Sequence, residues 1–290
     1  TRYGTVTGVQ TCALPISFDV FLWTFRRNEK DTVNLYNTLS PVMQLATGGT
    51  MLNFGYWTGD HTEPIPAQEN LCMVFANLAE LSSAKHVVDV GSGLSAPSHL
   101  WQQKFPEISL YDVNINYSQL SFGKKQKIEF LNSSSTKLPF ANNSVDRVLA
   151  LESAQHFKPL SDFISESKRV LTANGLLVMA IPVTLGNSSI KDLGMLKFTW
   201  SSEHYSFDDV KNTIQSCGFS IAEEELIGNH VYDPLADYYL QHRDKLKKLI
   251  LEKYPNYVEN ILYKSIIKMK DASEKQIIDY ALLKCTPETI

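Results

Sequence analysis

The sequence predicts an α/β fold in which a doubly wound parallel sheet carries helices on both faces. Short apolar runs alternate with segments of helical periodicity through the middle of the chain, which is the βαβ rhythm of such a sheet. The most informative run is VVDVGSG at residues 87–93, a buried strand that leads into a glycine turn. With 290 residues and 43% hydrophobic content, the chain can bury one large core of this kind.

Ahead of the first strand, residues 18–83 are expected to form a helical cap. Apolar residues recur at helical spacing over residues 18–50, and Pro41 is expected to kink or restart this helix. The segment MLNFGYW at residues 51–57 follows as an exposed aromatic loop. A second helix over residues 67–81 then leads into the sheet.

The core is expected to span residues 84–290, and its last strands form a pair. A final helix and strand are predicted at residues 207–227, and a closing strand at residues 277–287. Ligands in such sheets bind outside the carboxyl ends of the strands, where the strand order reverses. The earlier strands are expected near residues 87–90, 108–113, 127–131, 145–150 and 175–181.

Residues 228–270 interrupt that last strand pair, which would otherwise form a simple hairpin. The segment has helical character and carries several tyrosines among basic residues. An insertion at such a place is usually functional, so we expect a lid over a substrate. The alternative is a helical pair that only covers the sheet edge. Tyrosines on a lid would suit an apolar or aromatic substrate with a polar end.

The turn after the first strand has the features of a ligand site. Gly91 and Gly93 lack a Cβ, so the backbone can turn sharply and a ligand can lie against it. A dinucleotide site would want a third small residue and an acid about twenty residues further on. Here Asp89 precedes the turn. A carboxylate at this position suits a ligand with a cationic amino group rather than a pyrophosphate.

The order of these motifs resembles that of the class I S-adenosylmethionine (SAM) methyltransferases over roughly residues 30–287. VVDVGSG resembles their first motif, and residues 133–157 resemble the segment GDA-x-x-LPF … FDxVxxxESxxHF almost position by position. Residues 162–180 match the next helix, its RVL-x-x-x-G turn and the fifth strand. The resemblance implies a Rossmann-like SAM-methyltransferase sheet with an N-terminal helical cap and a helical lid before the last strand. It also implies SAM as the cofactor and S-adenosylhomocysteine as the product.

The resemblance further implies which residues contact the cofactor. Asp89 is expected to face the methionine amino group. Asn114 takes the place of the family's ribose-binding acid, with Asp112 as the alternative, and an amide can still hydrogen-bond a hydroxyl. Ser134 replaces the adenine-binding Asp. The full expected set is Asp89, Gly91, Gly93, Asn114, Ser134, Ser135, Tyr56 and Trp57.

The segment NFGYW at residues 53–57 resembles one that closes over the cofactor in relatives of gamma-tocopherol methyltransferase, rebeccamycin sugar methyltransferase and cyclopropane fatty acid synthase. Tyr56 is expected to hydrogen-bond the methionine end of SAM. Trp57 is expected to present a ring face to the sulfonium, an attraction worth about 0.5–2 kcal/mol. Tyr36, on the preceding helix, is a further candidate. The alternative is that these aromatic residues belong to the core.

Two titratable residues follow the fourth strand in the segment ESAQHF. A neutral imidazole at His156 could take a hydroxyl proton as the methyl group transfers, whereas the alternative is a histidine that only hydrogen-bonds backbone. Glu152 is expected to orient the site rather than act as the base. The predicted reaction is methyl transfer from SAM to a partly apolar small molecule, with a hydroxyl favoured over nitrogen or carbon. The alternatives are methylene transfer to a lipid and a SAM-binding protein without turnover.

Composition and residue pairs exclude several other classes. The chain has 27 basic and 31 acidic residues, so phosphate neutralisation does not favour nucleic-acid binding. No apolar stretch approaches the roughly 20 residues that a membrane span needs. The cysteines show no C-x-x-C spacing, and Asp146 stands apart from other carboxylates, so neither zinc nor magnesium is expected. We expect a cytoplasmic enzyme, and nothing in the sequence indicates its oligomeric state.

The first residues have a different origin in our interpretation. VTGVQTCALPI at residues 6–16 is the codon-by-codon translation of a common sequencing-adapter oligonucleotide. We therefore expect residues 1–17 to be an assembly artefact from environmental DNA and exclude them from fold reasoning. The alternative is a native apolar N-terminus.

Overall fold

The computed structural model describes residues 28–121, 127–186, 191–199 and 202–288. The expected artefact at residues 1–17 and the start of the expected cap at residues 18–27 lie outside these described residues.

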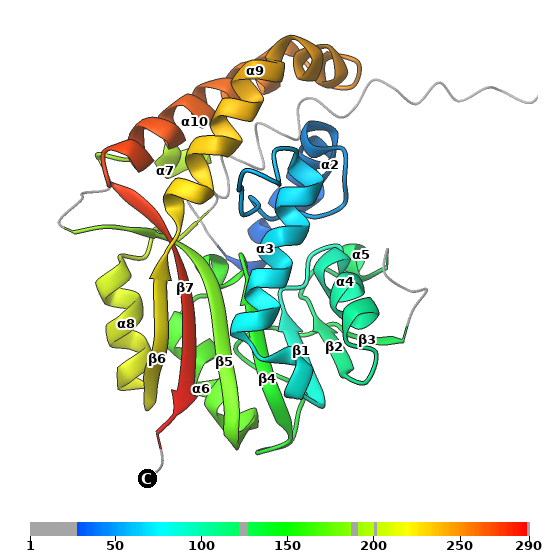
Figure 1. Ribbon diagram of the computed structural model, residues 1–290, viewed down its shortest axis with the longest axis vertical. Coiled ribbons are helices and arrows are strands. Elements are labelled where there is room, and N and C mark those ends of the chain that lie inside the picture. The colour runs from blue at the N-terminus through cyan, green and yellow to red at the C-terminus, as the bar shows by residue number, and fades with distance from the viewer. Residues whose placement is uncertain (1–27, 122–126, 187–190, 200–201, 289–290) are drawn as a thin grey trace, which may run out of the picture.

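A seven-stranded sheet forms the centre of the described part of the chain, with the strand order β3-β2-β1-β4-β5-β7-β6 (Figure 1). The first five strands run parallel to one another, and β7 runs antiparallel to both of its neighbours. The predicted α/β class, with a parallel sheet and a closing strand pair, is therefore confirmed. The strands are β1 (His86–Val90), β2 (Ser109–Val113), β3 (Ile128–Leu131), β4 (Val145–Leu151), β5 (Leu171–Thr184), β6 (Phe219–Leu226) and β7 (Ile278–Pro287).

Helices cover both faces of this sheet, as the near-continuous burial of its central strands requires. One face packs against α3, α4 and the base of α9 and α10, and the other against α6 and α8 (Figure 1). The helices are α2 (Glu29–Thr47), α3 (Pro64–Leu78), α4 (Ala96–Lys104), α5 (Tyr117–Leu120), α6 (Leu160–Val170), α7 (Leu196–Thr199), α8 (Phe207–Ser216), α9 (Tyr232–Leu251) and α10 (Asn256–Glu274), with single 3₁₀ turns at η1 (Leu81–Ser83), η2 (Ala154–His156) and η3 (Gly228–His230).

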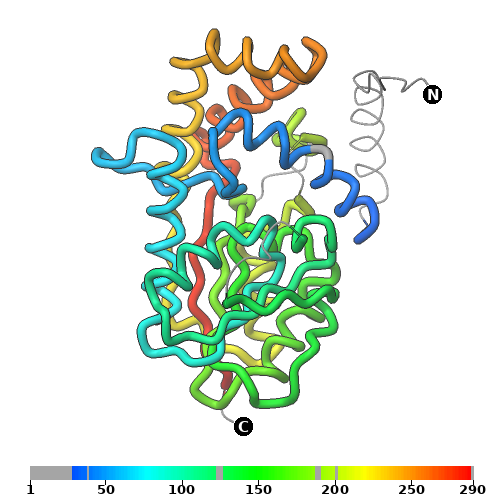
Figure 2. Tube along the Cα trace, turned by 90° about the vertical axis from the view of Figure 1, so that its right-hand side faces the viewer, coloured from blue at the N-terminus to red at the C-terminus, as the bar shows by residue number. Residues whose placement is uncertain are grey.

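Helix α2 is continuous through Pro41, so the expected restart of the helix at this residue does not occur. A proline inside a helix removes one backbone hydrogen bond, but tertiary packing can hold the flanking turns together. Here the next residue, Val42, is buried in an apolar cluster with Ile250 and Val258 of the α9–α10 hairpin. Figure 2 shows α2 passing between that hairpin and the sheet.

The second helix of the N-terminal part, α3, begins at Pro64 and not at Ala67 as expected. Proline is favoured in the first turn of a helix because its missing N–H would have no intrahelical partner there. The helix ends at Leu78, and the single turn η1 occupies residues 81–83 before the first strand.

The insertion predicted at residues 228–270 forms two long helices, α9 and α10, between β6 and β7. The helices form a hairpin beyond the carboxyl ends of the parallel strands (Figure 1). A buried carboxylate holds them together, because Glu259 on α10 accepts hydrogen bonds from Arg243 Nε at 2.8 Å and from Tyr239 OH at 3.3 Å on α9. The arginine also lies over the ring of Tyr263, 3.3 Å from its centroid.

Candidate active site

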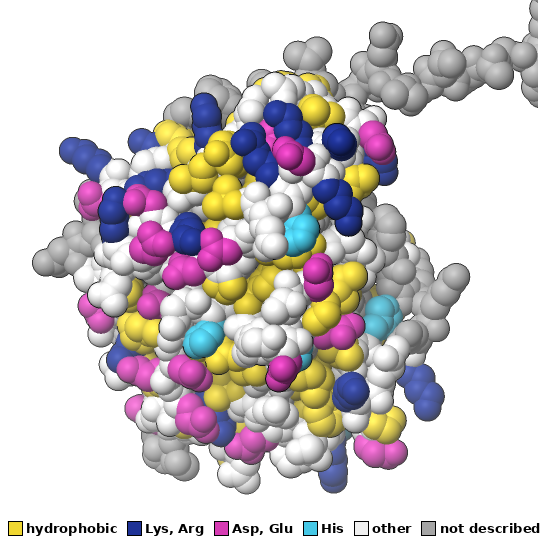
Figure 3. Space-filling view, turned by 45° about the horizontal axis from the view of Figure 1, so that its top comes forward, with side chains coloured by type: hydrophobic (Ala, Val, Ile, Leu, Met, Phe, Trp, Pro, Cys, Tyr) yellow, Lys and Arg dark blue, Asp and Glu magenta, His cyan; other side chains and the backbone are white. Residues whose placement is uncertain are grey.

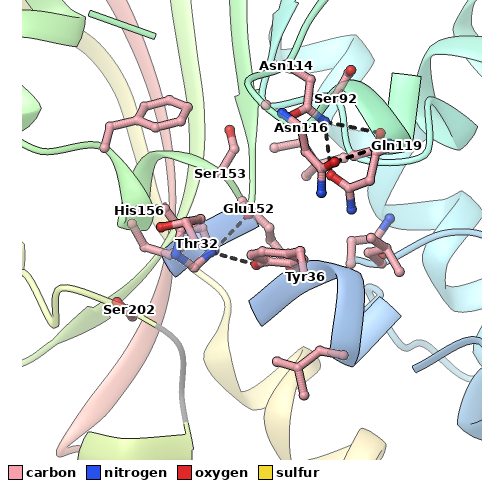
Figure 4. A pocket seen from close by; sticks show the side chains of 18 of the residues that line it. Thr32, Tyr36, Ser92, Asn114, Asn116, Gln119, Glu152, Ser153, His156 and Ser202 are labelled. Carbon is pink, nitrogen blue, oxygen red and sulfur yellow. Dashed lines mark hydrogen bonds between the residues drawn. The ribbon is translucent and has the colours of Figure 1, made fainter. Parts of the chain in front are cut away.

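A cavity of about 600 Å³ lies at the carboxyl ends of β1, β2 and β4, beneath α2 and α10 (Figure 4). The strand order reverses between β1 and β4, so this is the place where an open α/β sheet binds its ligands. The loops after β1, β2 and β4 line one part of it, and α2, α7 and α10 line the other.

The glycine turn after β1 forms the floor of the cavity. Gly91 and Gly93 have φ angles of 79° and 56°, in the left-handed region that favours glycine. A Cβ on Gly91 would lie 2.5 Å from the Cβ of Ser153, which itself donates a hydrogen bond to Val90 O at 2.6 Å. Ser95 is also left-handed, with φ 62°. The turn therefore needs the conformation that its glycines provide.

Asp89 lies at the end of β1, lines the cavity and is 3% exposed. Its neighbour in the parallel register is Asp112 of β2, which is fully buried. Burial raises the pKa of Asp89 well above its usual range, and the charge of Asp112 raises it further. One hydrogen bond opposes this, because Ser98 Oγ donates to Asp89 Oδ2 at 2.9 Å. A cationic group in the cavity would relieve the repulsion between these carboxyls.

Asn114 and Asp112, the two candidates for binding the ribose, differ in their position relative to the cavity. Asn114 lines the cavity, whereas Asp112 is not among the described residues that do so. The Asn114 amide is held in place, because its Nδ2 donates to Gly93 O at 3.2 Å and to Gln119 Oε1 at 3.1 Å. Its Oδ1 accepts from the backbone N–H of Asn116 at 2.9 Å (Figure 4).

The serines after β3 alternate in direction. Ser135 and Ser133 line the cavity, and Ser135 is 9% exposed. Ser134, which the resemblance assigned to adenine, is not among the described lining residues. Its hydroxyl instead donates to Glu29 Oε1 at 2.5 Å. The structure thus brings Ser135, but not Ser134, together with Asp89.

The aromatic segment presents residues to the cavity other than those expected. Leu52, Asn53 and Phe54 line it, whereas Tyr56 and Trp57 are not among the described lining residues. The expectation of an exposed loop is wrong for Trp57, which is 5% exposed.

The rings of Tyr56 and Trp57 pack instead against the base of the α9–α10 hairpin. The Trp57 ring lies 5.6 Å from the ring of Tyr238 on α9, and its indole N–H donates to Phe54 O at 3.0 Å. The Tyr56 ring lies 5.2 Å from that of His230. Both partners come from a segment far along the chain, so the loop sequence alone did not reveal these contacts.

His156 lies in η2, half-buried, and faces the cavity. Its Nε2 lies 2.6 Å from the hydroxyl of Tyr36 on α2, and the two rings meet edge to face (Figure 4). Withdrawal from bulk water lowers the pKa of His156 to about 3, so the imidazole is neutral near pH 7. Burial also raises the pKa of Tyr36, because it disfavours the charged tyrosinate, and the nearby charge of Glu152 raises it further. The pair is a tyrosine–histidine hydrogen bond without net charge.

Glu152 joins three segments around the cavity. Its Oε1 accepts a hydrogen bond from the backbone N–H of Phe54 at 2.8 Å and another from Tyr280 OH of β7 at 2.9 Å. Burial raises the pKa of Glu152 to about 8, so the carboxyl is mainly protonated near pH 7. Its backbone is left-handed, with φ 51°. Sequence reasoning missed Tyr280, because a tyrosine in a buried strand carries no local signal of a site.

The described part of the chain contains no group of three or more His, Cys, Asp or Glu residues placed to hold a metal ion. None of its helices is long and apolar enough to cross a membrane. Acidic and basic side chains are interspersed on the face drawn in Figure 3.

Comparisons with known proteins agree with this geometry. A family model described as a methyltransferase domain matches residues 88–179. Erythromycin 3''-O-methyltransferase of Saccharopolyspora erythraea is 25% identical over 264 residues, which are 84% of this chain and 84% of that protein.

Solved structures share the fold at low sequence identity. Geranyl diphosphate C-methyltransferase of Streptomyces coelicolor A3(2), in complex with Mg²⁺, geranyl diphosphate and S-adenosyl-L-homocysteine, has a TM-score of 0.70 at 12% identity, covering 89% of this chain and 97% of that one. The cyclopropane synthase MmaA2 of Mycobacterium tuberculosis has a TM-score of 0.71 at 13% identity, covering 87% and 95%. The family match and the O-methyltransferase relative identify the chain as a SAM-dependent methyltransferase. The chain belongs to the class I SAM-dependent methyltransferases that act on small molecules.

Proposed function

We propose that this methyltransferase transfers the methyl group of SAM to a hydroxyl oxygen of its small-molecule acceptor, with His156 as the proton acceptor. The observation that carries the proposal is the 2.6 Å contact between His156 Nε2 and Tyr36 OH, which lies in the same cavity as the glycine turn. Methylation of a hydroxyl needs a group that takes its proton, whereas many other acceptor atoms do not. The O-methyltransferase relative is consistent with such an acceptor.

The residues of the cavity fit the cofactor. The buried Asp89 carboxyl would hold the cationic amino group of the methionine end, and the backbone of the turn at Gly91 and Gly93 would lie against it. The fixed amide of Asn114 would bind a ribose hydroxyl, and Ser135 would lie near the adenine. Tyr56 and Trp57 enter the proposal as residues that fix the loop carrying Phe54, because their rings pack away from the cavity.

Bound SAM would supply a methyl group that is already activated on a sulfonium. The protein therefore has to place the acceptor oxygen in line with that group and keep water away from it. The α9–α10 hairpin is suited to this second task, since Leu262, Ile266 and Met269 of α10 cover the cavity. Glu152 positions the loop at residues 52–54 through its bond to Phe54 N.

The path of the proton follows from the hydrogen bond between the two aromatic residues. A neutral imidazole can accept the Tyr36 hydroxyl proton at Nε2, while the Tyr36 oxygen accepts the proton of the substrate hydroxyl. Because the pKa of His156 is low, the imidazole is neutral near pH 7 but is a weak base, so proton transfer to it has to be coupled to the transfer of the methyl group. Tyr36 is thereby the group that touches the acceptor, and His156 is the base behind it.

The proposal includes no metal, because a sulfonium methyl group needs no Lewis acid to activate it. Turnover is expected to be the same with and without EDTA. A loss of activity on chelation, restored by Mg²⁺, would show that an ion takes part.

The experiment uses the full chain in two stages. Calorimetric titration with SAM and S-adenosylhomocysteine is expected to give micromolar binding of both, with none for nicotinamide dinucleotides. Hydroxylated acceptors are then screened for S-adenosylhomocysteine formation, and the product is analysed by mass spectrometry and NMR. A methoxy group in the product supports the proposal, and a new C–CH₃ or N–CH₃ group overturns the hydroxyl assignment. Failure to bind either adenosyl compound would overturn the cofactor assignment itself.

A further inference from the structure

The cavity has two chemically different parts. The part beside the strands is polar and contains Asp89, Asn114 and Ser135. The other part lies between two helices and is mainly apolar. We call it the acceptor chamber, and it is lined by Val33, Leu39 and Met43 of α2 and by Leu262, Ile266 and Met269 of α10.

The spacing of these residues shows that each helix turns one apolar stripe toward the chamber. Residues separated by three, four or seven positions lie on the same face of a helix, which is the relation of Leu262, Ile266 and Met269. On α2, Leu39 and Met43 are four positions apart, and Tyr36 lies three positions from both Val33 and Leu39, so these lining residues follow one side of the helix. Apolar side chains that line a cavity retain surface that a ligand can cover, and covering it is favourable.

Contacts outside the chamber hold its two walls in place. Val42, next to Met43 in sequence, is 6% exposed and packs with Ile250 and Val258 of the hairpin. The bonds of Glu259 to Arg243 fix α10 against α9. The chamber is therefore formed by two supported helices and does not depend on a ligand for its shape.

The charges around the cavity disfavour an anionic ligand. Among its described lining residues the only lysine or arginine is Lys158, whose side chain is 58% exposed and paired with Glu203 at 3.1 Å. The acidic residues of the lining are Glu29, Asp89 and Glu152, but burial raises the pKa of Asp89 and of Glu152, so an anion is disfavoured mainly by the lack of a buried cation. A phosphate or carboxylate placed in the chamber would lose its water without gaining a buried cation.

From these observations we propose that the acceptor is an uncharged molecule with an apolar body. The body lies in the acceptor chamber between α2 and α10, and its hydroxyl meets Tyr36. The position of the hydroxyl rests on the proposed function, whereas the neutral and apolar character rests on the chamber alone. A diphosphate or a free carboxylic acid is outside the class that this chamber takes.

Two fluorescent probes with the same aromatic skeleton test the charge preference. N-phenyl-1-naphthylamine is neutral, and 8-anilinonaphthalene-1-sulfonate carries one added sulfonate. With the full chain saturated with S-adenosylhomocysteine, the neutral probe is expected to bind at least ten-fold more tightly than the anionic one. Equal or tighter binding of the sulfonate would overturn the proposal, and so would the absence of binding by the neutral probe.

Neighbouring isoleucines on α10 provide a matched pair of variants. Ile266 lines the chamber and is 9% exposed, whereas Ile267 lies on the outer face and is 41% exposed. Ile266→Trp is expected to fill the chamber and weaken binding of the neutral probe at least ten-fold, and Ile267→Trp to leave it unchanged. Met43→Trp, on the opposite wall, should also weaken binding of the neutral probe at least ten-fold. It replaces Ile266→Trp in the test if that variant does not fold. Wild-type probe binding in both chamber variants would overturn the assignment.

Calorimetry with S-adenosylhomocysteine on the same variants separates the two proposals. If the adenosyl compound does not bind but the neutral probe does, the proposed cofactor site is wrong and the chamber stands. If the adenosyl compound binds and the neutral probe does not, the chamber is wrong and the cofactor site stands.

Discussion

The hydroxyl of Tyr36 on α2 lies 2.6 Å from Nε2 of His156 in η2, although the two residues are 120 positions apart in the chain. This hydrogen bond joins the N-terminal helix to the loop after β4 inside the cavity. The pKa of His156 is low and that of Tyr36 is high, so both groups are uncharged over the physiological range. A proton that reaches His156 through Tyr36 makes the imidazole cationic, and the low pKa of His156 means that burial opposes this charge.

Removing either partner of this pair should slow turnover and spare the cofactor. Tyr36→Phe removes only the hydroxyl, and we expect it to lower kcat about 10- to 100-fold, while His156→Ala should lower it about 100-fold or more. The affinity for S-adenosylhomocysteine, measured by calorimetry, should stay within about two-fold of wild type. The double variant should be no slower than the slower single variant, because residues that act as one unit are not additive. Independent, multiplying losses would contradict the pairing.

Asp89→Asn should weaken cofactor binding without lowering the stability of the fold. The amide is close in shape to the carboxylate but lacks its charge, so SAM binding should weaken by at least about ten-fold, or about 1.4 kcal/mol. The melting temperature should stay the same or rise, since the substitution removes one of two adjacent buried carboxyls. Calorimetry and a thermal melt without ligand measure the two effects. Unchanged affinity would show that Asp89 does not bind the amino group.

Gly91→Ala tests the steric fit of the turn, and Gly48→Ala is its control. Both glycines are left-handed, with φ 79° and 77°, so both variants should lose about 1 kcal/mol from backbone strain. Only at Gly91 would the new Cβ clash, at 2.5 Å from Ser153, whereas nothing lies within 4 Å at Gly48. Gly91→Ala should therefore cost about 1–3 kcal/mol more in chemical denaturation and should also weaken SAM binding. Equal losses in the two variants would contradict the close contact.

Glu152→Gln should change how stability depends on pH. The pKa of Glu152 is raised from 4.5 to about 8 by burial, so the folded state holds this proton more tightly than the unfolded state. The contribution of Glu152 to stability is therefore fully present below about pH 4.5 and is lost as the pH rises to about 8. Glutamine keeps an oxygen that can accept from Phe54 N and Tyr280 OH but does not ionise.

The difference in unfolding free energy between Glu152→Gln and wild type should consequently grow in favour of the variant between pH 5 and pH 8. We expect a gain of about 1–3 kcal/mol at pH 8, allowing for solvent in the cavity that the carboxyl faces. Urea titrations across this range measure it. A constant difference would mean that Glu152 ionises normally in the folded protein.

Local sequence was sufficient for the strand and turn that carry Asp89, Gly91 and Gly93. These residues are contiguous, and the conformation of the turn depends on glycines within it, so the motif can be read without knowing the rest of the fold. The α/β class, the strand pair at the end and the helical insertion before β7 also followed from the order of periodic segments. Local sequence did not determine the course of α2, because packing against the hairpin carries this helix through Pro41.

Only the tertiary structure decided which side chains face the cavity. In a loop, the direction of a side chain depends on what packs behind it, and that neighbour can be far away in sequence. Trp57 packs against Tyr238 for this reason and does not line the site. Of the neighbouring serines, Ser135 lines the cavity, whereas Ser134 bonds to the lining residue Glu29.

The same reason explains the two pairs at the centre of the cavity, Tyr36 with His156 and Glu152 with Tyr280. The resemblance marked Tyr36, His156 and Glu152 as candidates, but nothing in the sequence paired them or pointed to Tyr280. The sequence by itself thus determined the fold class and the cofactor turn, because those depend on residues close together in the chain. Packing of distant segments determined the proton-accepting pair and the acceptor chamber, because those exist only where α2, α10 and the loop after β4 meet.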